Sequence, residues 1–127
     1  MKNKNLALLS AILLMVIASM ACVRLFRTVD PLEFEPDTLP ASQLGAPYEA
    51  KIRITQNITP AGGISITKGD LPDGLEFVRI AGEDAVKISG TPEETGAFTF
   101  TISVWCYGTN SNSGQTGEKE YNIVVEK

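Results

Sequence analysis

The chain has 127 residues, a length that fits a single domain, and it contains no histidine and only two cysteines. The most common general base and the usual four-ligand zinc site are therefore excluded. Residues 1–21 hold Lys2, Lys4 and no acid, so the rest of the chain keeps nine basic and 15 acidic residues, a net charge of −6, and we expect no nucleic-acid partner.

The first 21 residues have the layout of an export signal. Lys2 and Lys4 precede an almost wholly apolar stretch at 6–18, and small residues stand three and one positions before Cys22. This order is typical of a secretory signal. We expect residues 1–21 to be a signal peptide or a membrane-anchor helix, 22–31 a linker, and 32–127 the folded domain.

Three fates of this segment place the domain outside the cytoplasm. The segment resembles a bacterial lipoprotein signal, which implies a lipid anchor on Cys22, although Ser19 stands where such signals usually have leucine. Cleavage after Ala21 would instead give a soluble exported protein. Retention of residues 6–23 would give a transmembrane helix, with Arg24 and Arg27 outside, against the positive-inside tendency. We therefore expect an exported protein, anchored at a membrane of the cell envelope in two of the three cases.

From residue 32 onward, apolar and polar residues alternate with period two. Successive side chains of a strand point to opposite faces, so each run has one buried and one exposed face. This pattern predicts an all-β fold, an immunoglobulin-like antiparallel β-sandwich of about seven strands. The inward positions are expected to be Leu32, Phe34, Tyr48, Ala50, Ile52, Ile54, Phe98, Phe100, Ile102, Val104, Cys106, Tyr121, Ile123 and Val125.

Turn residues separate the expected strands. Proline second and glycine fourth in 71–74 favour a type I turn over these four residues. Residues 81–84 lie between two short apolar runs and predict a hairpin, and 90–96 predict a second tight crossing. Such spacing of turns agrees with an immunoglobulin-like sandwich.

Three motifs follow one another in the chain: LPDGL at 71–75, ISGTP at 88–92 and TGAFTF at 95–100. In this order they resemble a bacterial immunoglobulin-like domain family that is related to cadherin-like and dystroglycan-type modules, and the resemblance covers about residues 32–127. It implies an Ig-like fold, a surface or periplasmic location, and a role in adhesion, carbohydrate contact or spacing between modules. Trp105-Cys106-Tyr107 stands where many relatives carry an aspartate.

Acidic residues raise the question of calcium. The DxD and DxNDN patterns of cadherin-like calcium sites are absent, and calcium needs six to eight oxygen ligands. Asp70 with Asp73, or Glu93 with Glu94, are the pairs that would contribute to a calcium-binding module. Solvated turn acids are the simpler interpretation, and we expect no cofactor.

Trp105 and Tyr107 are the main candidate binding residues. The alternation turns both aromatic side chains outward, and exposed neighbouring aromatics offer a large, rigid and amphipathic contact surface. The alternative is that they pack under the following loop or against the linker. The loop at 108–117 is polar, contains the candidates Asn110 and Asn112, and corresponds to a recognition loop of variable-type Ig domains, or is a plain connector.

The remaining features argue against catalysis. Cys106 falls on the inward face and is expected to be buried and free. No nucleophile elbow, HExxH motif or phosphate-binding loop is present. We therefore expect a non-catalytic envelope lipoprotein that binds or adheres to a protein or a glycan, the alternative being a passive spacer or a calcium-binding cadherin-like module.

Overall fold

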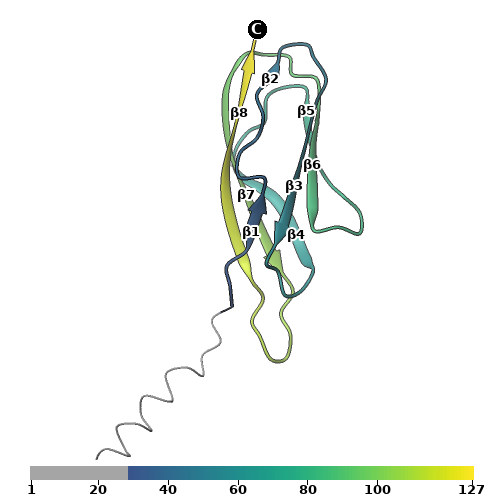
Figure 1. Ribbon diagram of the computed structural model, residues 1–127, viewed down its shortest axis with the longest axis vertical. Coiled ribbons are helices and arrows are strands. Elements are labelled where there is room, and N and C mark those ends of the chain that lie inside the picture. Colours follow the sequence, from purple (N-terminus) through teal and green to yellow (C-terminus); the bar gives the residue numbers. More distant parts are fainter. Residues whose placement is uncertain (1–28) are drawn as a thin grey trace, which may run out of the picture.

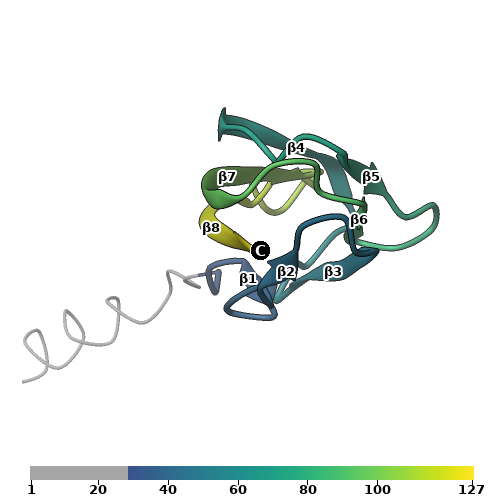
Figure 2. The same cartoon turned by 90° about the horizontal axis from the view of Figure 1, so that it is seen from above.

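The computed structural model describes residues 29–127 (Figure 1). Every regular element in this range is a strand, and the strands form two four-stranded sheets that pack face to face (Figure 2). The first sheet has the order β1 (Glu33–Glu35), β3 (Tyr48–Thr55), β6 (Ala85–Gly90) and β5 (Leu75–Arg79). The second has the order β2 (Ser42–Gln43), β8 (Thr116–Glu126), β7 (Gly96–Cys106) and β4 (Ala61–Gly69).

The core lies between the two sheets and follows the period of two. The inward residues of β3, β7 and β8 alternate with exposed or half-buried ones along nearly the whole of each strand. Phe100 stacks on Tyr121 with ring centroids 6.1 Å apart. Every expected inward residue is buried except Phe98, which is half-buried at the core edge. The prediction of an Ig-like β-sandwich is confirmed.

The strand count and one pairing differ from the expectation. Residues 29–127 contain eight strands, where about seven were expected, and β2 pairs with β8 in parallel, with Ser42 opposite Val125. The N-terminal part of the chain thus adds β1 to one sheet and β2 to the other. A strand of two residues is too short to show an alternating pattern in the sequence. Its position is set by pairing with the partner strand.

The turn before β5 lies one residue later than predicted. The Leu75 amide donates to the Pro72 carbonyl at 3.1 Å, so the turn spans 72–75. Gly74 is its third residue and has φ +89°. Positive φ at the third position defines a type II turn and not type I, and it requires glycine there. A Cβ on Gly74 would also lie 2.0 Å from the Thr91 carbonyl oxygen.

The other two predicted turns are confirmed. Residues 80–84 close the β5–β6 hairpin, and 91–95 carry the chain from β6 in the first sheet to β7 in the second. The expected signal, its cleavage site and Cys22 lie outside the described residues. Within residues 29–127 the structure contains no helix long and apolar enough to cross a membrane.

Candidate functional site

Trp105 and Tyr107 lie at the end of β7, on the outside of the second sheet. The β7 residues at even positions from 100 to 106 point into the core, so the odd positions point outward. Trp105 is 48% exposed and Tyr107 is 56% exposed. The predicted exposure of both side chains is therefore confirmed, whereas their role in binding stays a prediction.

The Trp105 ring is seated on two glycines of the neighbouring strand. Ideal Cβ atoms would lie 2.1 Å from Cη2 if built on Gly62 and 2.4 Å from Nε1 if built on Gly63. The ring thus spans the Gly62–Gly63 backbone at contact distance, where any side chain would push it away. A bulge in β4 falls between Ala61 and Gly63. One face of the indole is covered by this backbone, and the ring still exposes nearly half of its surface.

Tyr107 meets this ring edge-on. The two ring centroids are 5.0 Å apart and the ring planes are inclined by 76°. This edge-to-face arrangement is favourable for aromatic pairs. We call Trp105 and Tyr107, with the Gly62–Gly63 seat, the aromatic corner. Support for the Trp105 ring comes from β4, and both aromatic side chains remain about half exposed.

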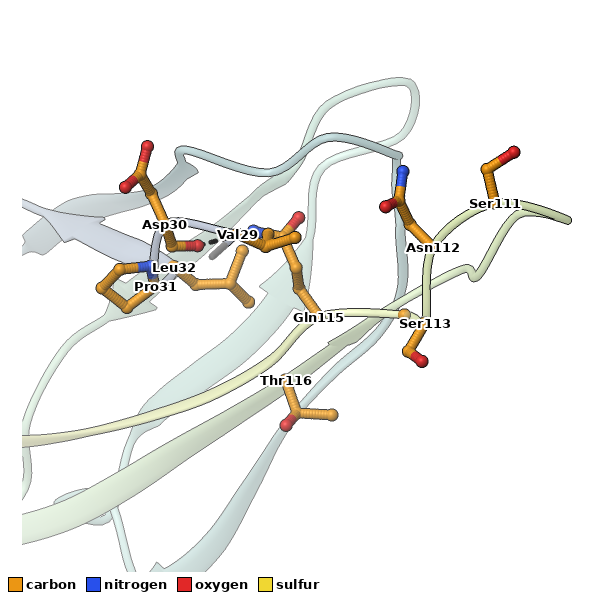
Figure 3. Close-up of a pocket in the computed structure, with 10 residues that line it drawn as sticks. Val29, Asp30, Pro31, Leu32, Ser111, Asn112, Ser113, Gln115 and Thr116 are labelled. Atoms are coloured by element: carbon orange, nitrogen blue, oxygen red, sulfur yellow. Dashed lines mark hydrogen bonds between the residues drawn. The ribbon is translucent and has the colours of Figure 1, made fainter. Parts of the chain in front are cut away.

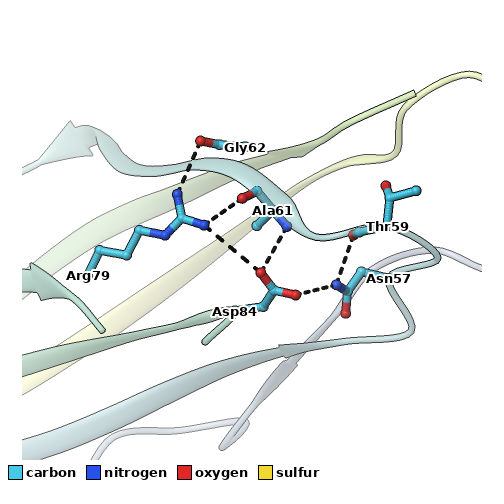
Figure 4. Close-up of polar contacts among 6 residues, drawn as sticks. All are labelled: Asn57, Thr59, Ala61, Gly62, Arg79 and Asp84. Atoms are coloured by element: carbon cyan, nitrogen blue, oxygen red, sulfur yellow. Dashed lines mark hydrogen bonds and ion pairs between the residues drawn. The ribbon is translucent and has the colours of Figure 1, made fainter. Parts of the chain in front are cut away.

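A polar cluster behind the corner fixes the start of β4 (Figure 4). The Asp84 carboxylate accepts hydrogen bonds from the Ala61 amide at 2.9 Å and from Asn57 Nδ2 at 2.7 Å. Arg79 donates to the carbonyls of Ala61 and Gly62, at 2.5 and 3.1 Å, and its guanidinium lies 4.0 Å from Asp84. These bonds tie β5 and the β5–β6 hairpin to the β4 segment that carries the Trp105 ring.

The loop at 107–115 is ordered by its own hydrogen bonds. The Thr109 hydroxyl accepts from the backbone amides of Ser111 and Asn112, at 3.3 and 3.1 Å. The Thr109 amide donates to the Asn112 carbonyl at 2.8 Å. Asn110 and Asn112 are both exposed in this loop. The polar hairpin loop is confirmed, and the loop starts directly at Tyr107.

Gln115 ties this loop to two other segments. Its Nε2 donates to the carbonyls of Asp30 at 2.9 Å and Gln56 at 3.0 Å, and its Oε1 accepts from the Ile58 amide at 2.7 Å. The linker and the loop together border an open pocket of about 430 Å³ (Figure 3). Asn112 lines this pocket, but neither Asn110 nor the two aromatic residues do. The four candidate residues therefore do not line one cavity.

Cys106 points away from this surface into the core. It is buried, and no disulfide partner exists for it among residues 29–127. Burial, followed by the charge of Asp84, raises the pKa of the Cys106 thiol, which keeps it protonated and unreactive. Within the same residues, no three acidic or cysteine side chains gather to form a metal site.

Sequence reasoning missed the supporting residues of the corner. In the sequence, Asp84 is one residue of the predicted hairpin turn at 81–84 and Gln115 is one polar residue of the predicted loop at 108–117. The pair Gly62-Gly63 is assigned no role there. Only the glycine pair carried a signal, since adjacent glycines within a strand often mark close approach of another group. The Asp84 and Gln115 contacts join segments more than 20 residues apart, which no local pattern shows.

Comparisons with known proteins find similarity in fold alone. No protein-family model matches the chain, and no curated protein matches it. The chain is similar in structure to the SrpA adhesin from Streptococcus sanguinis, with a TM-score of 0.59, 16% identity, and coverage of 81% of this chain and 60% of the adhesin structure. The chain thus spans less than two thirds of that relative.

A second solved structure with this fold is an enzyme of much greater length. The endo-fucoidan hydrolase MfFcnA9 of glycoside hydrolase family 107 matches with a TM-score of 0.54 and 19% identity, over 80% of this chain but only 18% of the hydrolase. At these sequence identities, the comparisons show a similar fold and nothing more. The chain is an immunoglobulin-like β-sandwich, similar in structure to part of an adhesin.

Proposed function

We propose that this chain is an exported, membrane-anchored envelope protein whose Ig-like domain makes non-catalytic binding contacts through the aromatic corner and the loop beside it. The observation that carries the proposal is the seating of Trp105 on Gly62–Gly63. A ring held in place on one face and open on the other loses little conformational entropy when a partner covers it. The structural likeness to part of an adhesin supports a contact role.

A protein or a carbohydrate surface fits the chemistry of this region. The corner offers two aromatic rings, and the adjoining loop offers the amides and hydroxyls of Asn110, Ser111, Asn112 and Ser113. None of these groups is charged, and exposed aromatics beside adaptable polar groups are typical of contact surfaces. The alternative is a passive spacer, in which the corner would contact nothing.

The binding test replaces Trp105 with alanine in the detergent-solubilised full chain and measures its retention on immobilised envelope glycan and protein, because detergent occupies the anchor and removes its contribution. We expect Trp105→Ala to fold normally, because the side chain is half exposed, and to lose retention. Val124→Ala, an exposed apolar residue near the other end of β8, serves as the matched control and should keep it. Equal retention of all three proteins would leave the spacer as the better account.

The anchor is tested separately by the intact mass of the protein extracted from its own membranes. We expect the mass of residues 22–127 plus acyl groups, since the segment before Cys22 resembles a lipoprotein signal. The mass of the full chain would indicate an uncleaved helix. The bare mass of 22–127 would indicate a soluble exported domain and would contradict the lipid anchor.

A further inference from the structure

The linker enters the domain at the end that carries the aromatic corner. Residues 29–32 lie beside the loop at 107–115, and the C-terminus lies at the opposite end of the sandwich (Figure 1). The hydrogen bond from Gln115 Nε2 to the Asp30 carbonyl fixes this entry, and β1 then pairs with β3 from Glu33 onward. The position of the linker relative to the corner is therefore set by the fold.

The linker is short, so this end cannot move far from its attachment. Val29 is the seventh residue after Cys22, so seven residue steps join the two. They span at most about 24 Å when fully extended, at roughly 3.4 Å per residue. A membrane that holds the chain at Cys22, or at the apolar stretch before residue 24, would face the corner end and not the C-terminal end.

Two of the three loops at this end carry no charge, although the protein is acidic. Neither 54–67 nor 95–117 contains a charged residue, and these segments form the β3–β4 loop, the β7–β8 loop and the strands leading from them; the third loop is the β5–β6 hairpin. Ile58 lies in the first of these loops and is 57% exposed. The next two residues hold this loop beside the corner, because the Thr59 hydroxyl donates to the Tyr107 carbonyl and the Tyr107 amide donates to the Pro60 carbonyl.

Of the charged residues at this end, Arg79 and Asp84 are engaged with the start of β4, and Glu83 is paired with Lys51. Asp30 is an exposed acid where the linker enters.

A lipid–water interface suits this combination of groups. Tryptophan and tyrosine concentrate there, because the apolar ring and the polar tip are each in a favourable medium. Neutral amides and hydroxyls of the loop can bond to headgroups without the cost of moving charge toward the bilayer. Arg24 and Arg27, next to the attachment, would attract anionic headgroups.

We propose that the aromatic corner and Ile58 rest on the lipid–water interface of the membrane that holds the N-terminal segment. This inference goes beyond the binding contact proposed above, because it names a lipid surface as a partner of the corner, and it rests on the membrane attachment included there. A protein or carbohydrate partner of the corner would then have to lie at the membrane surface.

Trp105 is the only tryptophan of the chain, so its fluorescence reports on this site alone. The experiment reconstitutes the full chain, purified from its membranes, into phosphatidylcholine vesicles with or without acyl chains brominated near the headgroup. We expect the protein to float with the vesicles, its emission to shift to shorter wavelength than in detergent-free buffer, and brominated lipid to quench it. Ile58→Ser with Tyr107→Ser should reduce the quenching, whereas Val124→Ser should not.

The outcomes separate the two proposals. Protein that floats with the vesicles but is quenched by iodide and not by brominated lipid would overturn the lipid contact and leave the attachment standing. Protein that fails to float would contradict the attachment, and the lipid contact with it. The Trp105 emission could instead stay the same with lipid and shift when soluble envelope glycan or protein is added. That result would assign the corner to the added partner and overturn the inference.

Discussion

Two glycines decide whether Trp105 can lie where it does. The indole occupies the space that side chains at Gly62 and Gly63 would fill, so the absence of two Cβ atoms creates the seat. The backbone holds the ring on its covered face, and the other face is open to solvent. At this scale the period of two predicted the outward direction of Trp105 and the inward direction of Cys106, because both follow from strand geometry. It could not predict the seat, which depends on the strand that lies alongside.

Replacing Gly62 with alanine should displace the ring without unfolding the domain. The new Cβ would lie 2.1 Å from Trp105 Cη2, and the indole is the group that can move. We expect the emission of the single tryptophan to shift to longer wavelength, and binding at the corner to fall. Ser65→Ala, on the outward face of the same strand, is the control. Unchanged emission in Gly62→Ala would show that the ring does not rest on this backbone.

Tyr121 should make the domain less stable at high pH. Burial, and then the charge of Asp37, raises the pKa of the Tyr121 phenol from 10.0 to about 12. The unfolded state therefore loses this proton first, so the stabilisation is complete below about pH 10 and is lost as the pH rises to about 12.

Tyr121→Phe isolates this contribution. At neutral pH it should cost about 1 kcal/mol, since it removes the hydrogen bond to the Pro36 carbonyl. Between pH 10 and 12 its free energy of unfolding should fall less than that of the unchanged protein. Chemical denaturation at several pH values in this range measures the free energy of unfolding of both proteins. Other groups that titrate here, such as Tyr48 and Cys106, contribute equally to both and cancel in the difference. Parallel pH profiles would contradict the assignment to Tyr121.

At the scale of elements, the corner is held by contacts between loops and strands that are distant in the chain. Asp84 and Arg79 connect the β5–β6 hairpin to the start of β4, and Gln115 connects the last loop to the linker and to the β3–β4 loop. The long strands β3 and β7 could be predicted because each has an alternating run along most of its length, and β8 could be predicted over 121–125, where its apolar residues alternate. The two-residue β2 and the register of the Pro72–Leu75 turn could not, because backbone pairing and a positive φ decide them.

Asp84→Ala should weaken the whole domain more than loss of its neighbour Glu83. Removal of the carboxylate leaves the amide of the buried Ala61 without an acceptor and takes one of two acceptors from Asn57 Nδ2, and such losses cost about 1–3 kcal/mol. Glu83 forms an exposed ion pair with Lys51, so Glu83→Ala should cost at most about 1 kcal/mol. Urea unfolding followed by circular dichroism compares the two. Equal losses would mean that Asp84 does not support β4.

For the whole molecule, the fold determines which end faces the site of attachment. The sandwich has its C-terminus at one end, and the linker, the neutral loops and the aromatic corner at the other (Figure 1). The sequence predicts an exported sandwich with outward aromatics, but the relation between linker and corner depends on how the last loop folds back beside residues 29–32. If the N-terminal segment holds the chain at a membrane, as proposed, that relation places the corner next to the membrane.

Photo-crosslinking in living cells tests this central claim most directly. The full chain would carry p-benzoylphenylalanine in place of Tyr107, or in place of Val124 at the other end of the domain as the control. We predict that illumination joins position 107 to a membrane component, whether lipid, glycan or envelope protein, and that position 124 gives no such product. Absence of a product at 107, or the same products from both positions, would contradict the account.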